Sequence, residues 1–488
     1  MAKRSNVPAP GIAQWDRGRW ALGSPHAACL AGALFSLAGA APAQSTTSPA
    51  NLPTVSESPP SSSGLSWHGI TLYGTVDVGF QYETHGAPFS DYYAASSADI
   101  VQKNSHRSIA GFTSSNLSQS RIGLQGTEPL SFGDWAGIFR LETFFNPTSG
   151  QISDALKSLA QNNGRTLDQQ STNLDSSVGG QAFQQSYAGL SSATFGTITF
   201  GRQNSVLADG IARYDPNAAS QAFSLIGLSG VAAGGGDTQD RRLDSSVKYG
   251  VQYLNLRLGA MYKFSNANTG ANSAYELSLG GHYGGFCADA YYVKVKSAIA
   301  LAPLSAAQVT ELPALGYSVS NSLAATVSDN TTFALLAMYS LAPFEVYAGY
   351  ENIKFTNPQT PLAAGFDVAA YKIAFVNNMA FPHERILQVY WAGAKYSVNS
   401  HLDLTMAYYG YHQSNFGTTA ATVGCSGDVS GTCSGELHDF SFDAVYKLSK
   451  RFDVFAGLMY SDVAGGLANG YVYSKNNIAT TTGVRFAF

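Results

Sequence analysis

The last eleven residues of the chain alternate in polarity up to the final position. One face of this stretch is apolar or threonine, at Ile478, Thr480, Thr482, Val484, Phe486 and Phe488. The residues between them are small or charged and include Arg485. A period of two predicts a strand with two different faces. A strand that alternates to a terminal aromatic residue is typical of a transmembrane β-barrel, whereas soluble domains usually end in a frayed tail.

The composition agrees with a barrel in a membrane. Charged residues make up only 12% of the 488 residues, and hydrophobic residues make up 45%. Soluble domains contain about 25% charged residues, so much of this surface faces something other than water. After residue 45 the sequence has no run of 18 apolar residues, which argues against a transmembrane helix. A barrel explains both facts, because every second residue of its strands is polar.

Residues 1–43 have the organisation of a secretory signal peptide. Basic residues precede an apolar run at 27–41, and Ala41-Pro42-Ala43 offers a cleavage site. Residues 44–66 are rich in Ser, Thr and Pro and are predicted to be a flexible lead-in to a barrel domain at 67–488. The whole chain has a formal charge of -4 and its first 43 residues a charge of +3, so the remainder is near -7. This charge argues against nucleic acid as a partner.

Alternating runs recur sixteen times, and an even number is typical of bacterial barrels. We place them at 70–83, 120–129, 135–146, 183–192, 196–204, 243–253, 254–265, 274–284, 286–297, 331–341, 343–356, 386–398, 400–413, 438–448, 450–461 and 477–488. The fold class is therefore all-β, a sixteen-stranded antiparallel transmembrane barrel. The segment 370–376 is also apolar, but a seventeenth strand would break the even count, so we interpret it as part of a loop.

The connections alternate between short turns and long loops. The long loops are predicted at 84–119, 147–182, 205–242, 298–330, 357–385 and 414–437. Long external loops and short periplasmic turns are the outer-membrane pattern, with both termini on the periplasmic side. Aromatic residues near the predicted strand ends suit interface girdles or packing between barrels; they are Tyr82, Phe144, Tyr262, Phe264, Tyr408, Tyr411, Phe452 and Tyr460.

Several short stretches match a known family in order along the chain. They are Thr71–Asp77, Ser120–Glu128, Leu141–Asn146, Tyr187–Ser192, Phe200–Gln203, Ser246–Tyr249, Ala348–Tyr350 and Gly483–Phe488. On these stretches the chain resembles the trimeric general diffusion porins of Gram-negative bacteria, in the Burkholderia and Neisseria branch. The third long loop lacks the Pro-Glu-Phe-Gly-Gly motif of enteric porins. The second long loop carries an insert, 153–160, that is expected to form a short helix.

The resemblance implies a homotrimer of barrels in the outer membrane, each with a water-filled pore for small hydrophilic solutes and ions. Its surroundings would be outer-membrane lipid and lipopolysaccharide. Phe488 would be the signal that the barrel-assembly machinery reads. The third long loop, about 205–242, would fold into the pore.

Strand parity predicts that several charged side chains face the lumen. By resemblance, the strands from the second to the sixth carry a basic ladder opposite acids of the third long loop. The basic candidates are Arg121, Arg140, Arg202, Arg242 and Lys248, and the acidic candidates are Asp209, Asp215, Asp237 and Asp240. Opposed charges in a narrow pore would favour polar solutes, with the sign of the ion preference left open. Alternatively, the arginines only satisfy carbonyls and carboxylates, and the aspartates are ordinary turn formers.

The cysteines predict one disulfide. Cys29 lies in the signal segment and Cys287 is alone in a strand pattern. Cys425 and Cys433 bracket a segment of turn formers in the seventh long loop. In an exported protein such a pair is expected to form a disulfide.

The sequence contains no intact G-x-S-x-G, H-E-x-x-H or P-loop motif. We therefore expect no enzyme activity, no cofactor and no metal. A substrate-specific channel or an adhesin-like surface barrel remains an alternative to a general porin, and an outer-membrane barrel enzyme is a remote one.

Overall fold

The computed structural model describes residues 65–93, 100–171, 182–226, 241–265, 273–418 and 430–488. The predicted signal peptide and nearly all of the predicted lead-in lie outside these ranges. Residues 52–488 form one compact unit. Its antiparallel sheet closes on itself, because β2 (Ile70–Gly86) pairs with β21 (Asn476–Ala487). The backbone of Phe488 extends this seam through two hydrogen bonds of 3.0 Å with Gly74.

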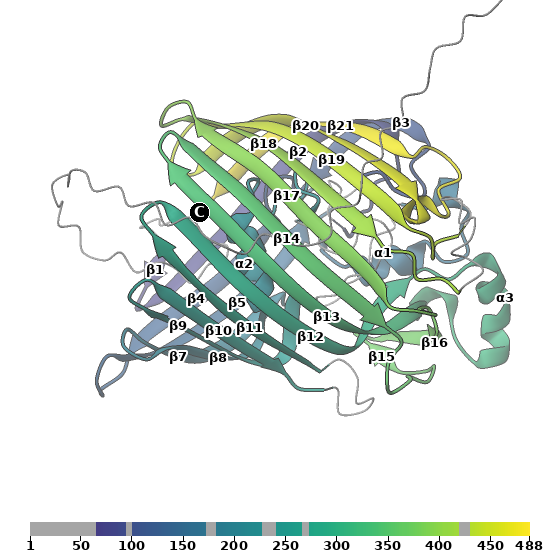
Figure 1. The fold of residues 1–488 in the computed structure, drawn as a ribbon, viewed down its shortest axis with the longest axis horizontal. Helices are drawn as coiled ribbons and strands as arrows, with labels where there is room; N and C mark the ends of the chain where they lie inside the picture. Colours follow the sequence, from purple (N-terminus) through teal and green to yellow (C-terminus); the bar gives the residue numbers. More distant parts are fainter. Residues whose placement is uncertain (1–64, 94–99, 172–181, 227–240, 266–272, 419–429) are drawn as a thin grey trace, which may run out of the picture. The chain divides into compact units, whose positions relative to one another are not determined.

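The described residues form sixteen barrel strands, as predicted (Figure 1). The second strand consists of two pieces, β3 (Arg107–Ser114) and β4 (Arg121–Pro129). Between these and β21 follow β5 (Trp135–Asn146), β7 (Gln185–Ser192), β8 (Gly196–Asn204), β9 (Arg242–Tyr253), β10 (Leu256–Lys263), β11 (Ala274–Tyr283), β12 (Phe286–Ala302), β13 (Ser322–Leu341), β14 (Phe344–Thr356), β17 (Arg385–Ser397), β18 (Leu402–Gln413), β19 (Gly435–Lys447) and β20 (Phe452–Gly465).

Shorter elements lie in the connections between these strands. They are α1 (Ala155–Gln161), α2 (Val206–Tyr214), α3 (Ala306–Leu315), the 3-10 turns at Leu167–Gln169, Val319–Asn321 and Gly466–Ala468, and the short strands β1 (Ser66–Trp67), β6 (Gln151–Ile152), β15 (Asp367–Val368) and β16 (Tyr371–Asn377). Helix α1 confirms the helix expected at 153–160. Every helix among the described residues falls short of the length and hydropathy that a membrane span needs.

The second barrel strand is interrupted in the middle. β3 pairs with the outer half of β2, and β4 pairs with its other half. The prediction of a loop over 84–119 was therefore wrong at 107–114. Residues 115–120 form the break, where Ser115 has a φ of +62°. We name residues 115–120 the strand break.

Two strands extend beyond the others at the long-loop end. β12 continues to residue 302 and β13 begins at residue 322, so both enter the segment predicted as the loop 298–330. β16 is a strand where a loop was expected, but it pairs in parallel with the outer end of β13. It therefore does not add to the barrel count. Leu156 and Leu159 of α1 and Ile373 of β16 pack there in a small apolar cluster.

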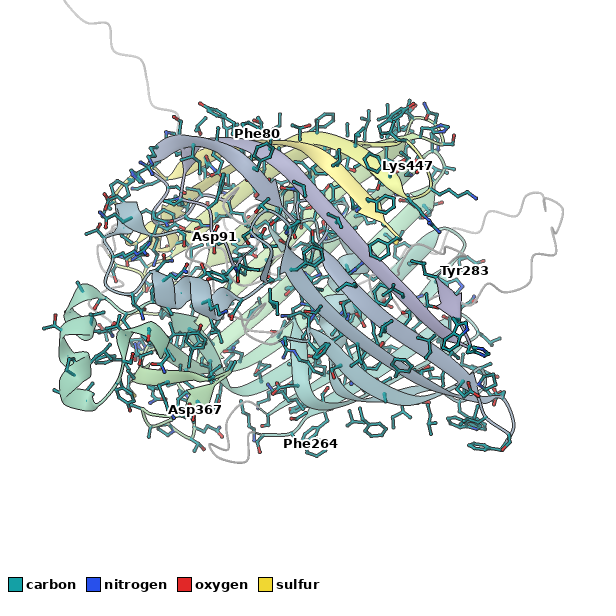
Figure 2. The ribbon with its side chains drawn as sticks, turned by 180° about the vertical axis from the view of Figure 1, so that it is seen from behind. Phe80, Asp91, Phe264, Tyr283, Asp367 and Lys447 are labelled. Atoms are coloured by element: carbon teal, nitrogen blue, oxygen red, sulfur yellow. The ribbon has the colours of Figure 1, made fainter. Side chains whose placement is uncertain are left out.

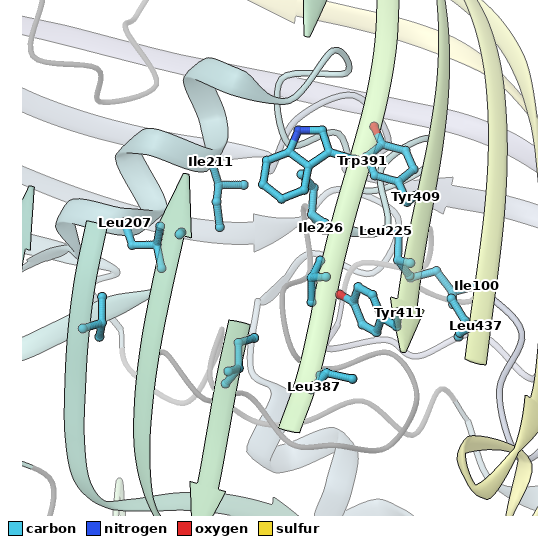
Figure 3. Close-up of a cluster of buried hydrophobic side chains, with 14 of the residues drawn as sticks. Ile100, Leu207, Ile211, Leu225, Ile226, Leu387, Trp391, Tyr409, Tyr411 and Leu437 are labelled. Atoms are coloured by element: carbon cyan, nitrogen blue, oxygen red, sulfur yellow. The ribbon is translucent and has the colours of Figure 1, made fainter. Parts of the chain in front are cut away.

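The two faces of most strands differ as predicted. On β2 the outer side chains Phe80 and Tyr82 are exposed, while Asp77 and Gln81 on the inner face are buried. Figure 2 shows Phe80 on the outside of the barrel. On β17 and β18 the middle of the inner face is apolar as well. Figure 3 shows part of this inner cluster, including Trp391 and Tyr409.

Two predicted girdle residues lie inside the barrel instead. Phe144 and Tyr411 are both buried. Tyr411 points inward because it has the parity of the inner-face residue Tyr409, and loop side chains such as Leu225 pack with it in the inner cluster. Phe144 is covered by a guanidinium group.

Candidate pore constriction

Three of the predicted basic residues, Arg121, Arg140 and Arg242, gather on the inner wall of β4, β5 and β9, and Arg202 of β8 lies close enough to interact electrostatically with Arg242. Their centre is Glu142, a residue of β5. Arg140 forms an ion pair with Glu142, with Nη2 and Oε2 2.8 Å apart, and the Arg121 Nε lies 3.8 Å from the same oxygen. The Tyr73 hydroxyl donates to Oε2 at 2.8 Å, and Gln185 Nε2 donates to Oε1 at 3.0 Å. Glu142 thus holds two guanidinium groups in fixed positions.

The strand register explains this arrangement. Arg140 and Glu142 are two residues apart on one strand, so their side chains share a face. Gly123 of β4 lies opposite Glu142 of β5 on one side and opposite Tyr73 of β2 on the other. Because Gly123 has no side chain, the Tyr73 ring can cross it to reach Glu142. A Cβ at Gly123 would collide with that ring.

Replacing Gly123 with alanine is therefore expected to push Tyr73 away from Glu142. We expect a loss of about 1–3 kcal/mol in the free energy of unfolding, typical of overpacking in a closely packed site. The Gly250→Ala variant is the matched control, because no atom lies within 4 Å of a Cβ built there. Urea unfolding in lipid vesicles measures both variants. Equal stability of the two would show that Tyr73 does not need this gap.

The remaining arginines extend the cluster. Arg242 is buried, and its guanidinium carbon lies 4.5 Å from the centre of the Phe144 ring. It interacts electrostatically with Arg121, Arg202, Arg241 and Glu142. Together with Arg140 these make five arginines. We name the five arginines and Glu142 the arginine cluster, which has a formal charge of +4. Its repulsion is relieved by Glu142 and by the face of Phe144.

The third long loop begins with α2, which is fixed to the inner wall at its start. Ser205 accepts a hydrogen bond from the Ala208 N–H at 3.0 Å and caps the helix. Glu276 of β11 accepts the N–H groups of Val206 at 2.7 Å and Leu207 at 3.1 Å. A carboxylate at a helix N-terminus also interacts favourably with the helix dipole. A side chain of the barrel wall therefore satisfies the first free N–H groups of α2.

The end of α2 is bound to the wall through Asp289 of β12. The Tyr214 hydroxyl donates to Asp289 at 2.8 Å, and Arg257 Nη2 of β10 lies 2.9 Å from its other oxygen. Trp391 Nε1 of β17 donates to the Tyr214 carbonyl at 2.9 Å. Leu207 and Ile211 of the helix pack into the inner cluster (Figure 3).

Beyond α2 the loop turns and reaches the strand break. Asp215 accepts hydrogen bonds from the Tyr409 hydroxyl at 2.6 Å and the Ala219 N–H at 2.8 Å. This carboxylate holds a turn in which Ala218 and Ala219 both have positive φ. The N–H groups of residues 221 and 222 then donate to the carbonyl of Asn116, each at 2.9 Å. The described part of the loop therefore follows the inner wall from β8 round to the second strand.

The comparisons with known proteins agree with this architecture. The family model of the Gram-negative porins matches residues 27–466. The chain belongs to the Gram-negative porin family. This family and the outer membrane porin relative place the protein in the bacterial outer membrane.

The individual relatives of this porin are distant. An outer membrane porin protein of Bordetella pertussis is 27% identical over 211 residues, 43% of this chain and 46% of that protein. The aligned region thus spans about half of that relative. An anion-selective porin from Comamonas acidovorans superposes with a TM-score of 0.54 at 18% identity, covering 86% of this chain and 99% of that one. OmpT of Vibrio cholerae in its trimer form gives 0.52 at 14%, with coverages of 86% and 99%. These two structures show the fold.

Of the predicted acids of this porin, Asp209 contacts a predicted basic residue, whereas Asp215 has another role. Asp209 pairs with Lys248 of β9 and also accepts a hydrogen bond from Asn204 at 3.1 Å. Asp215 holds the turn after α2. Asp237 and Asp240 lie outside the described residues. Glu142, which contacts Arg121 and Arg140, belongs to their own wall, and Asp244 interacts electrostatically with Arg202.

Sequence reasoning missed Glu142 in this porin, although a signal existed. The residue lies in the matched stretch Leu141–Asn146 and has the same parity as Arg140. Glu276, Asp289 and Arg257 were also missed, because nothing in the sequence shows where α2 meets the wall. In the described part of the chain, no three His, Cys, Asp or Glu side chains are arranged to bind a metal ion.

The cysteines of this porin are partly placed. Cys287 is a free thiol on β12, and Cys433 is disulfide-bonded. Cys425 lies in the segment 419–429, outside the described residues. The pairing of Cys425 with Cys433 stays a prediction.

Proposed function

We propose that this porin forms a water-filled channel through which small hydrophilic solutes and ions diffuse passively across the outer membrane. Sixteen strands make a barrel wide enough for an aqueous path. The observation that carries the proposal is the arginine cluster on the inner wall, with the third long loop bound to other strands of the same wall. Charged side chains surrounded by low-dielectric walls attract or repel the ions and polar solutes that pass between them.

The constriction proposed for this channel is lined by Arg121, Arg140, Arg202 and Arg242, with Glu142 as their positioning residue. The Lys248–Asp209 pair adds no net charge at the start of the third loop. A cluster of formal charge +4 supports a weak preference for anions. The Comamonas acidovorans porin of similar fold is anion-selective, which agrees with this sign.

We further propose that the protein assembles as a homotrimer. The support is its family and the trimer form of the Vibrio cholerae OmpT structure of similar fold. Outer-membrane lipid and lipopolysaccharide would contact the exposed apolar face of each barrel. Phe488 at the seam would serve as the signal for the barrel-assembly machinery. Blue native electrophoresis of the detergent-extracted protein tests the trimer, and a monomer in mild detergent would contradict it.

Liposome swelling with sugars of graded size tests the channel. We expect the swelling rate to fall smoothly with sugar size and not to saturate with concentration, because passage depends on size alone. Saturation would instead indicate a substrate-specific channel. Absence of swelling, with barrel insertion shown by protease protection, would favour an adhesin-like surface barrel. A salt gradient across a planar bilayer gives the sign of ion preference from the reversal potential.

A further inference from the structure

The first long loop connects β2 and β3, and its described residues 100–106 enter the barrel. The Val101 N–H donates to the Ser461 hydroxyl at 2.7 Å. Ser461 lies on the inner face of β20, four residues before the end of that strand. At about 3.3 Å per residue, this contact is about 13 Å from the outer end of the strand. The loop therefore does not stay at the mouth.

Two apolar side chains of this loop are packed against the wall. Ile100 and Val101 are each 1% exposed. They belong to the same buried cluster as Leu437 of β19 and Met459 of β20. Figure 3 shows Ile100 beside Leu437 on the inner side of these strands. Hydrophobic burial thus favours the inward position.

The first and third long loops meet in this cluster. Leu225 and Ile226, from the described end of the third loop, are buried in the same group of side chains. Figure 3 places both of them between α2 and the strands that Ile100 contacts. The β17–β20 side of the barrel is therefore filled by two loops, while the arginine cluster lies on β4, β5, β8 and β9.

Other loops hold the segment in place. Asn104 Nδ2 donates to the carbonyls of Gln170 at 3.0 Å and Ser171 at 2.8 Å in the second long loop. The Ser474 N–H, between β20 and β21, donates to the Ser105 carbonyl at 3.2 Å. The segment is therefore tied on both sides and has a fixed position in the lumen.

We infer that residues 100–105 of the first long loop are a second constricting segment. This segment lies on the inner wall at β19 and β20, away from the arginine cluster, and sets the size limit of the channel. This inference rests on the proposed channel function. The arginine cluster acts mainly on charge, whereas this segment acts mainly on cross-section, because Ile100 and Val101 pack it against the wall and Lys103 is its one charged residue.

The double variant Ile100→Ser/Val101→Ser tests the inference. It removes the apolar contacts that keep the segment against the wall, so single-channel conductance should rise by roughly 1.5- to threefold and larger sugars should pass in the swelling assay. The substitutions alter no charge, so the reversal potential should change only through the displacement of Lys103, the one charged residue of the segment. Unchanged conductance and size limit would overturn the inference.

The control removes buried leucines from a cluster outside the lumen. Leu304 and Leu312 pack with Ala374 beside α3. The Leu304→Ser/Leu312→Ser variant is expected to keep the conductance of the unmodified protein. If both double variants raise the conductance alike, general loosening explains the effect and the inference fails.

A cross-link provides a test that does not depend on a destabilised variant. The short bond between Val101 and Ser461 brings their Cα atoms within the range of a disulfide. The oxidised Val101→Cys/Ser461→Cys variant should conduct like the unmodified protein, because the segment already occupies this position. A lower conductance that reduction restores would show that the segment normally lies elsewhere. If the unmodified barrel itself conducts no current, that result contradicts the proposed channel function. It is distinguishable from the results that contradict the second constricting segment, because those require a conducting barrel.

Discussion

Replacing Arg121 and Arg202 together with serine is expected to shift the reversal potential toward cations. The change lowers the formal charge of the arginine cluster from +4 to +2. In a narrow channel with low-dielectric walls the field of these groups is poorly screened, so we expect the anion-to-cation permeability ratio to fall by roughly two- to fivefold. Conductance should also rise, because two long side chains leave the constriction. Planar-bilayer recordings under a salt gradient measure both quantities.

The control for this variant removes the same charge from the surface. Arg165 and Lys450 are exposed side chains in the connections between strands. Their replacement with serine changes the net charge of the protein equally but should leave the reversal potential unchanged. If Arg121→Ser/Arg202→Ser alters neither conductance nor reversal potential, these arginines do not line the constriction and the assignment by strand parity is wrong there.

The Asp77→Ala variant is expected to release the strand break and, with it, the third long loop. Asp77 is buried and accepts four hydrogen bonds, from the Asn116 N–H and Nδ2 at 3.0 Å, the Leu117 N–H at 2.8 Å and the Ser118 N–H at 3.0 Å. Loss of a buried carboxylate leaves these donors unsatisfied. We expect the free energy of unfolding to fall by about 3–5 kcal/mol, measured by urea titration in vesicles.

Channel recordings should show a second effect of this variant. The Asn116 carbonyl accepts the N–H groups of residues 221 and 222, so a displaced break no longer holds the loop. Current noise in the open channel should therefore increase. Asp453→Asn is the control, because Asp453 also faces inward on a strand but pairs with a single residue, Arg485. If both variants lose the same stability, the strand break has no special role.

The sequence predicts the barrel well because the membrane imposes a simple rule on it. Lipid contact requires an apolar side chain at every second position, and this rule can be read locally along each strand. The same parity placed Arg121 on the inner face. It also gives the closing strand at Asn476–Ala487, where the alternation continues to the chain end.

The interior is less predictable because it depends on contacts between distant segments. On β17 the run Val389-Tyr390-Trp391 is apolar on both faces, which is typical of a strand that is buried on both sides. The run does not show which segment covers the inner side. The partners are α2, Leu225 and Ile100, which are far away in the chain. For the same reason the four hydrogen bonds to Asp77 were not predicted.

The acids of the third loop show that residue type alone does not determine the role of a side chain. Asp215 was expected to face the arginines, yet its carboxylate is turned toward the Tyr409 hydroxyl and the turn at Ala218. A turn with two residues at positive φ needs an acceptor for its free N–H groups. An aspartate supplies this acceptor locally, and the sequence alone cannot distinguish this role from a role in the pore.

The packed interior has a mechanical consequence. Closely packed side chains have low compressibility, and those on the inner face of β17–β20 are supported from within by two loops. The wall that carries the arginine cluster has no comparable apolar support among the described residues. We therefore expect the barrel to be unequally stiff around its circumference. Thermal changes in the width of the opening are expected to arise more from the charged wall than from the packed side.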